Sequence, residues 1–226
     1  CGTATAVSLP CLFSGFSRSD YDADIASHQE GLLDILKRAG YAVSWIDNNS
    51  GCKGTCARVD TLPLLASRKA AWCGEDGECL DDIVVDTLAE HLKRAPVQDR
   101  VVVIHQMGSH GPAYFKRYPP AYRRFTPTCD SNELQRCTPE QVRNTYDNTI
   151  AYTDHILART IQVLQQEPRY RSAFWYVSDH GESTGEKGLY LHGAPYLFAP
   201  SQQTHVPMLA WLSPGYRELL GARADC

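Results

Sequence analysis

The sequence contains no apolar run that approaches the roughly 20 residues needed to cross a bilayer, so it predicts no transmembrane helix. It also has no signal peptide and no initiator methionine, and we expect it to be part of a longer chain. No basic run is present, and 22 basic against 26 acidic residues give a net charge of −4, so nucleic acid is not an expected partner. Internal repeats and low-complexity segments are absent. The 226 residues, 43% of them hydrophobic, predict a single domain over residues 1–226 with a large core.

The cysteines lack the two-residue spacing of a zinc ribbon or a thioredoxin site. Eight of the nine fall into close pairs in loops, namely Cys1/Cys11, Cys52/Cys56, Cys73/Cys79 and Cys129/Cys137. Such local pairs are typical of disulfides, which persist in the periplasm or outside the cell. Reduced thiols in a cytosolic enzyme are the alternative. Cys226 is left over, and its partner is expected to lie outside the sequence.

Hydrophobic periodicity predicts alternating helices and strands along the chain. Helices are expected over residues 5–13, 27–38, 80–95 and 138–166, and strands over residues 41–46, 100–105, 172–177 and 205–212. Thr138 and Pro139 are good capping and first-position residues for the long fourth helix. The nearly all-apolar run at 100–105 is typical of a central strand in a parallel sheet. The predicted fold class is α/β, with a mainly parallel central sheet sandwiched by helices.

An acid and an imidazole stand side by side where the strand at residues 172–177 ends. Asp179 and His180 are followed by Gly181, where the chain can turn and allow both side chains to reach one ion. Carboxylate oxygen and imidazole nitrogen suit Zn²⁺ or a similar divalent metal. An Asp that caps the next turn, beside a surface His, is the simpler interpretation of the dipeptide alone.

Other predicted strand ends carry polar groups of the same kind. His110 follows the strand at 100–105, His192 follows Asp179 by thirteen residues, and Lys53 follows the strand at 41–46. Taken singly, each of these residues has an ordinary structural explanation. His105, at the end of the strand at 100–105, is expected to be a core or strand-end histidine. Together they predict a metal site for an anionic, oxygen-rich ligand such as phosphate at one edge of the sheet.

The first predicted helix provides candidates for a nucleophile. Thr3, Thr5 and Ser8 place hydroxyls at a helix N-terminus, where free N–H groups favour anions. A threonine hydroxyl is a poor nucleophile unless a metal favours its ionised form. All three could simply be capping residues, and their spacing does not choose among them.

Several motifs occur in a fixed order along the chain: Cys1-Gly-Thr-Ala-Thr5-Ala-Val-Ser-Leu-Pro-Cys11-Leu-Phe-Ser14, Asp47-Asn-Asn-Ser50, His105-Gln-Met-Gly-Ser-His110-Gly-Pro-Ala-Tyr-Phe-Lys-Arg-Tyr118, Tyr146-Asp-Asn148, Ser178-Asp-His-Gly-Glu-Ser183 and Leu191-His-Gly193. In this order they resemble the lipid A phosphoethanolamine transferases of the alkaline phosphatase superfamily, which include the mobile colistin-resistance enzymes. The resemblance covers nearly the whole chain.

The resemblance implies a role for each matching residue. It implies that Thr5 is the nucleophile and a Zn²⁺ ligand, with Asp179 and His180 as further metal ligands. His110 and His192 match histidines that line the site and handle substrate phosphate or a second metal. Asn49 and Lys53 match phosphate-binding positions. Three of the cysteine pairs match family disulfides, and Cys52–Cys56 matches a bridge that only some members carry.

The family pattern also includes parts that this sequence does not contain. A fourth zinc ligand, a glutamate on an upstream strand, and the membrane-spanning helices are expected before Cys1, and a closing strand and helix after Cys226. We therefore expect residues 1–226 alone to bind zinc more weakly than a chain extended upstream, which calorimetry on both would test.

The implied activity is transfer of phosphoethanolamine from phosphatidylethanolamine to a lipid A phosphate through a phosphothreonine, which gives polymyxin resistance. The expected location is the bacterial inner membrane with the catalytic domain in the periplasm, and a monomer is expected. Alternatives are a transferase acting on another periplasmic acceptor, a phosphodiesterase of the same superfamily, or a non-catalytic lipid- or polymyxin-binding domain.

Overall fold

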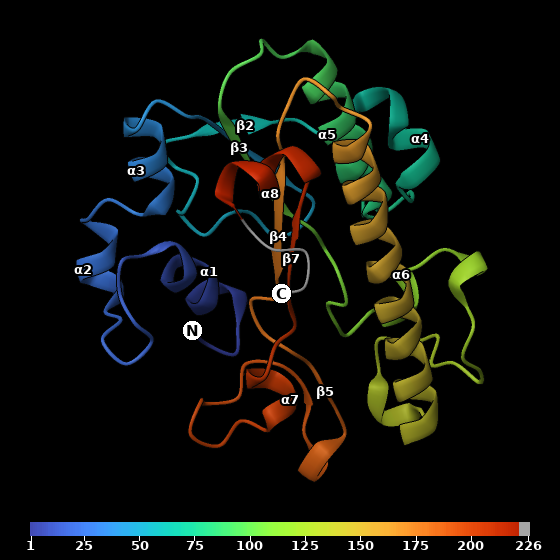
Figure 1. The fold of residues 1–226 in the computed structure, drawn as a ribbon. Coiled ribbons are helices and arrows are strands. Elements are labelled where there is room, and N and C mark those ends of the chain that lie inside the picture. Colours follow the sequence, from blue (N-terminus) through green and yellow to red (C-terminus); the bar gives the residue numbers. More distant parts are fainter. Residues whose placement is uncertain (222–226) are drawn as a thin grey trace.

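A computed structural model describes residues 1–221, so the leftover Cys226 lies outside the described residues. The helices are α1 (Thr5–Phe13), α2 (Ala23–Ser27), α3 (Leu32–Arg38), α4 (Lys69–Trp72), α5 (Asp82–Arg94), α6 (Pro139–Gln165), α7 (Ser201–Thr204) and α8 (Pro214–Leu220) (Figure 1). The strands are β1 (Ala42–Asp47), β2 (Asp60–Leu62), β3 (Arg100–His105), β4 (Ala173–Val177), β5 (Ser183–Thr184), β6 (Tyr190–Leu191) and β7 (Met208–Leu212). The predicted alternation of helices and strands is confirmed, and only short elements such as β2, α4 and α7 were not anticipated.

The central sheet is parallel, with strand order β2-β1-β3. β4 and β7 pair antiparallel with each other, and β5 and β6 form a further short antiparallel pair. The expectation that residues 100–105 form the central strand is wrong, because β1 is the middle strand of the described parallel sheet. The apolar run of β3 reflects helices on both faces, since Val102 and Ile104 pack towards one cluster and Val103 towards another.

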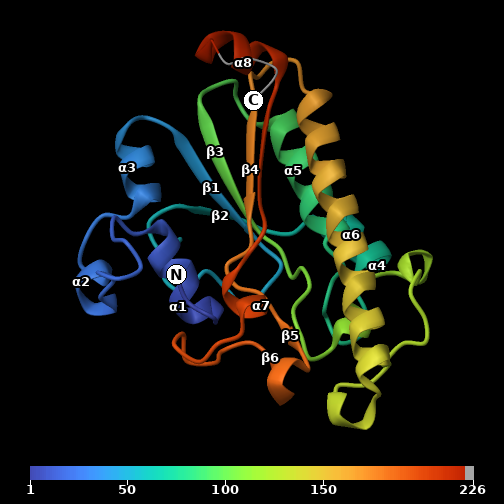
Figure 2. The same ribbon diagram turned by 60° about the horizontal axis from the view of Figure 1, so that its bottom comes forward.

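Helices cover both faces of the sheet, as the α/β prediction requires (Figures 1 and 2). Successive side chains of a strand point to opposite faces, and β1 shows this clearly. Val43 and Trp45 pack with residues of α1 and α3, whereas Ile46 packs with residues of α5 and α6. Trp45 and Ile46 are fully buried, so β1 joins the two halves of the core.

The predicted helix over residues 27–38 is wrong in its first part. Ser27 ends α2, and α3 begins only at Leu32. Between them the Gly31 amide donates to the Asp34 carboxylate at 2.9 Å, which caps a new helix and interrupts the apparent periodicity. The other helix predictions hold to within about two residues, the usual uncertainty of helix ends.

Helix α6 begins as its sequence indicates. The Thr138 hydroxyl accepts from the Gln141 amide, the Gln141 side chain accepts from the Thr138 amide, and Pro139 is the first helical residue. The four cysteine pairs form disulfides, Cys1–Cys11, Cys52–Cys56, Cys73–Cys79 and Cys129–Cys137. Within residues 1–221, none of the helices has the length and apolarity that a membrane span requires.

Candidate active site

Polar side chains meet beyond the carboxyl ends of β1 and β3. Because the register pairs Asp47 with His105, the loops that follow the two strands leave the sheet side by side. His105 Nδ1 lies 3.1 Å from the Asp47 carboxylate, so His105 is a strand-end histidine as expected. The Asn49 amide group donates to the Gln106 carbonyl at 3.1 Å and joins the two loops.

Asp47 stabilises this end of the sheet in its ionised form. Burial opposes ionisation, but hydrogen bonds from His105, the Trp45 indole and the Asn49 amide outweigh it and lower the pKa of Asp47 to about 2. An unfolded aspartate titrates near ~3.9. The stabilisation is therefore present above about pH 4 and is lost as the pH falls towards 2.

We expect Asp47→Asn to lower the free energy of unfolding by about 1–2 kcal/mol at pH 7, where the lost carboxylate is ionised and half-buried. Urea unfolding at several pH values measures this, and the difference from wild type should shrink as the pH falls below 4. Asp60, an exposed residue of β2, provides a matched control as Asp60→Asn. A difference that stays constant down to pH 2 would contradict the role of the charge.

A second carboxylate, that of the buried Asp81, holds the same two loops together. It accepts hydrogen bonds from the Asn48 side chain at 2.8 Å and from the Met107 and Gly108 amides at 2.9 and 2.7 Å. Burial raises the pKa of Asp81 against the effect of these donors. By fixing residues 107 and 108, Asp81 positions the segment that carries His110.

Of the three candidate hydroxyls, the structure brings only that of Thr5 to His180. Thr5 is the first residue of α1, and its Oγ1 lies 3.2 Å from His180 Nε2, with both residues buried. Thr3 Oγ1 instead donates to the Ala194 carbonyl, and Ser8 Oγ accepts from the Gly2 amide. Thr5 therefore combines a helix N-terminus with an imidazole, which the spacing of the hydroxyls could not show.

Asp179 completes a set of three donor atoms. Its Oδ2 lies 3.7 Å from His180 Nε2, is buried, and accepts no hydrogen bond from the described residues. An ion with Zn–N and Zn–O bonds of about 2.0–2.2 Å holds tetrahedral ligand atoms about 3.3–3.6 Å apart, close to the 3.2 and 3.7 Å separations found. A buried carboxylate oxygen without a donor is costly unless a cation is present. The chemistry of the three donor atoms and these two separations therefore fit a zinc ion.

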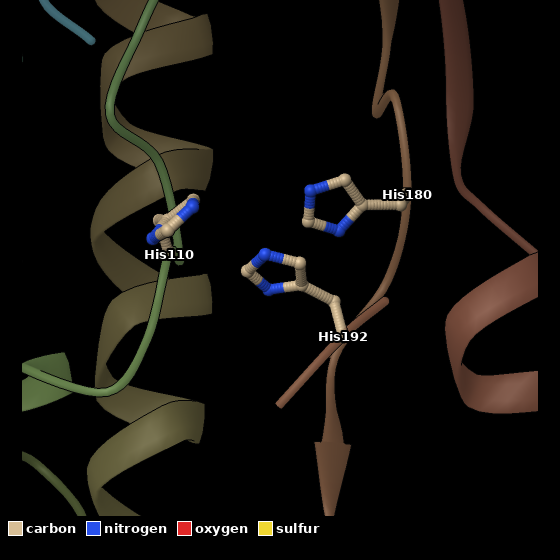
Figure 3. Close-up of side chains that lie close together, drawn as sticks. All are labelled: His110, His180 and His192. Carbon is tan, nitrogen blue, oxygen red and sulfur yellow. The ribbon is translucent and has the colours of Figure 1, made fainter. Parts of the chain in front are cut away.

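Three histidines come together beside this set. The ligand atoms of His110, His180 and His192 lie within 4.8 Å of one another, and the rings of His180 and His192 point towards His110 (Figure 3). Each Nδ1 faces an acceptor: the Gly111 carbonyl for His110, the Gly181 carbonyl for His180, and Glu182 for His192. Those bonds place a proton on Nδ1, so in the neutral form of each ring Nε2 has a lone pair for an ion, a substrate or a proton.

Glu182 belongs to the motif that contains Asp179 and His180, but the motif did not predict a role for it. Its buried carboxylate accepts from His192 Nδ1 at 2.9 Å, from the Gly111 amide at 3.2 Å and from the Tyr114 hydroxyl at 3.0 Å. It therefore positions His192 and the turn after His110 at once. The hydrogen bond to Glu182 raises the pKa of His192, whereas burial, with the neighbouring histidines, lowers the pKa of His110.

The two predicted phosphate-binding residues lie in the loop after β1. Lys53 has a φ of 50° in a segment closed by the Cys52–Cys56 disulfide, and its ammonium donates to the Ser50 carbonyl at 2.7 Å. Among the side-chain hydrogen bonds of residues 1–221, Lys53 forms none with the three histidines. Its role and that of Asn49 towards phosphate stay predictions.

Neither Asp81 nor Glu182 was predicted as a functional residue, because a carboxylate in a loop or at a helix start usually faces solvent. Asp81 stands directly before α5, where an acidic residue is also a common helix-start signal. Glu182 follows His180 by two residues, and this position within the motif was the one signal in the sequence for a functional role.

The fold and the histidine cluster define an α/β protein of the alkaline phosphatase and sulfatase type. The sulfatase family matches residues 1–225. The chain belongs to that family.

Two curated relatives and a solved structure show which members of the family the chain is similar to. The chain is 50% identical to phosphoethanolamine transferase EptA of Salmonella typhimurium over 96% of its length, and 42% identical to phosphatidylethanolamine transferase Mcr-1 of Escherichia coli over 93%. It matches the integral membrane protein lipooligosaccharide phosphoethanolamine transferase A from Neisseria meningitidis with a TM-score of 0.92, at 49% identity over 98% of the chain and 41% of that structure. The chain spans 40% of the length of both curated relatives. The chain is thus more similar in sequence to the EptA of Salmonella typhimurium than to Mcr-1.

Proposed function

We propose that the chain is the catalytic part of a zinc-dependent transferase that moves phosphoethanolamine from phosphatidylethanolamine to a phosphate of lipid A. The observation that carries this proposal is the meeting of Thr5, His180 and Asp179 at the N-terminus of α1. The names of the relatives, two phosphoethanolamine transferases and a phosphatidylethanolamine transferase, support the same chemistry. We further propose that the whole protein resides in the inner membrane with this part in the periplasm, where its four disulfides persist.

Thr5, Asp179 and His180 would hold the zinc ion, which supplies a Lewis acid that favours the ionised form of the threonine hydroxyl. Thr5 Oγ1 attacks the phosphorus of phosphatidylethanolamine, a P–O bond to Thr5 forms, and the P–O bond to diacylglycerol breaks. In the second displacement an oxygen of a lipid A phosphate attacks the same phosphorus, and the bond to Thr5 breaks. The free N–H groups at the start of α1 offset negative charge on the phosphoryl oxygens during both steps.

His192 and His110 carry out different proton transfers in the proposed reaction. Glu182 favours the cationic form of His192, so His192 suits the donation of a proton from Nε2 to the departing diacylglycerol oxygen. His110 presents an unprotonated Nε2 next to it and suits binding of the acceptor or removal of its proton. Asn49 and Lys53 are proposed to bind the phosphoryl oxygens from the loop after β1.

Expression of the full-length protein in a polymyxin-susceptible bacterium, followed by mass spectrometry of its lipid A, tests the function. We expect lipid A to gain phosphoethanolamine and polymyxin susceptibility to fall, since the added amine masks a phosphate charge. Unmodified lipid A together with phosphoethanolamine on periplasmic glucans would identify a different acceptor. Release of free phosphoethanolamine without transfer would identify a phosphodiesterase, and no turnover would favour a binding domain.

We expect Glu182→Gln to lower transfer activity about 10- to 100-fold, the usual cost of losing a carboxylate that orients an imidazole at a metal site. The glutamine keeps the shape but loses the charge that stabilises the His192 cation. Tyr114→Phe is a matched control, because it removes a different hydrogen bond to the same carboxylate and leaves its charge in place. Full activity in Glu182→Gln, with an unchanged melting temperature, would show that Glu182 has no part in the reaction.

A further inference from the structure

An exposed apolar tip stands next to the candidate active site. The loop between β6 and α7 lies at the lower edge of the molecule in Figures 1 and 2. At its tip Leu197 and Phe198 are 91% and 77% exposed, and the preceding Tyr196 is 41% exposed. Single exposed apolar residues are common, whereas Tyr196, Leu197 and Phe198 expose apolar side chains together at one turn, and contiguous apolar surface is typical of interaction sites.

The loop is held firmly at its base and closed by its own backbone. The Phe198 and Ala199 amides both donate to the Pro195 carbonyl, at 2.8 and 2.9 Å, which makes a tight turn. The Ala194 amide donates to the side chain of Gln203, a residue that is almost fully buried. The tip is therefore presented outwards by a fixed turn.

The base of the loop is joined to the nucleophile segment. Thr3 Oγ1 donates to the Ala194 carbonyl and the Gly193 amide donates to the Thr3 carbonyl, both at 2.6 Å. Tyr196 and Asp179 line the same small pocket, together with Leu12 of α1. The residue that precedes the apolar tip and the proposed zinc ligand thus border the same pocket.

A cation accompanies the tip. The guanidinium carbon of Arg18 lies 4.0 Å from the centre of the Tyr196 ring. A lipid surface has phosphate groups on its outside and hydrocarbon beneath them. The exposed Arg18 guanidinium suits the phosphate layer, and the adjacent Leu197 and Phe198 side chains suit the hydrocarbon. This complementarity favours a phospholipid surface over a protein partner.

We propose that Leu197 and Phe198 insert into the bilayer surface and that Arg18 binds lipid phosphates there, which brings the phospholipid headgroup to Thr5. The inference rests on the proposed function, because a diacyl lipid donor gives the site a reason to sit against a membrane. A membrane-bound enzyme has to take its donor from the bilayer, and an anchored tip shortens the path of the headgroup to the site.

The first test uses full-length protein in phospholipid vesicles, with Phe198→p-benzoylphenylalanine as a photocrosslinker. Val97→p-benzoylphenylalanine is the control, since Val97 is 62% exposed and precedes the opposite, amino-terminal end of β3. We expect mass spectrometry to find phospholipid adducts at position 198 and none at position 97. Adducts with a peptide of the same chain or of a second copy would overturn the proposal, and so would no adduct at 198 or equal lipid labelling at both positions.

The second test is kinetic and compares two donors, phosphatidylethanolamine in vesicles and soluble dihexanoyl phosphatidylethanolamine. In the double variant Leu197→Ser, Phe198→Ser, we expect the ratio of kcat/KM for the vesicle donor to that for the soluble donor to fall about tenfold, mainly through KM. Val97→Ser should leave the ratio unchanged. An unchanged ratio in the double variant would overturn the proposal. No transfer from either donor by the wild type would instead refute the proposed function, and the crosslinking result would still decide the membrane contact.

Discussion

Replacing Thr5 with alanine should reduce phosphoethanolamine transfer by about 10³-fold or more, because the attacking oxygen is removed. The side chain is small and lies at the first position of α1, where alanine is well tolerated, so we expect the fold to persist. Mass spectrometry of lipid A from cells that express the full-length variant measures the loss. Thr5→Ser keeps a hydroxyl beside His180 and should retain part of the activity.

A trapped intermediate gives an independent measurement of the same residue. With phosphatidylethanolamine and no acceptor, we expect the wild-type peptide that contains Thr5 to carry phosphoethanolamine, and the alanine variant to carry none. Lipid A that is modified at the wild-type level in Thr5→Ala cells would show that another group attacks. Thr3 and Ser8 would then be the candidates, despite their hydrogen bonds to the backbone.

Replacing Asp179 with asparagine should lower zinc affinity by about 10²-fold or more, since the variant loses the carboxylate charge at the proposed metal site. The Asp179 Oδ2 atom is buried without a hydrogen-bond donor among the described residues. In the metal-free protein we therefore expect the substitution to leave stability unchanged or to raise it. Without metal, the melting temperature of Asp179→Asn should equal or exceed that of the wild type. With zinc, only the wild type should gain stability, because a ligand stabilises the state that binds it.

Calorimetric titration with zinc and thermal unfolding with and without the ion check both parts of this prediction. Asp154→Asn, at an exposed position of α6, is the matched control and should bind zinc as the wild type does. Equal zinc affinity in Asp179→Asn would remove Asp179 from the ligand set. The cluster of His110, His180 and His192 would then be the candidate metal site, since the Nδ1 of each ring faces its own acceptor and Nε2 is left for an ion.

The local pattern of the sequence predicts most helices and strands because their signals are short-range. Thr138 and Pro139 fix the start of α6, and the apolar run of β3 identifies a strand with two covered faces. The same run does not reveal strand order, since β1 and not β3 is the middle strand of the parallel sheet. The break between α2 and α3 also escaped prediction, because the Gly31–Asp34 cap competes with an apparently continuous apolar period.

The sequence by itself determined the α/β class, the cysteine pairs and the residues Thr5, Asp179, His180, His110 and His192 as candidates, since these depend on neighbouring residues and motif order. Tertiary structure alone decided that Thr5, rather than Thr3 or Ser8, meets His180, which lies 175 positions away in the sequence. It also decided that Glu182 and Asp81 face inwards as acceptors for the two segments that carry His192 and His110. Such contacts depend on how the loops leave the sheet, and that geometry is set by packing across the whole core rather than by any local pattern.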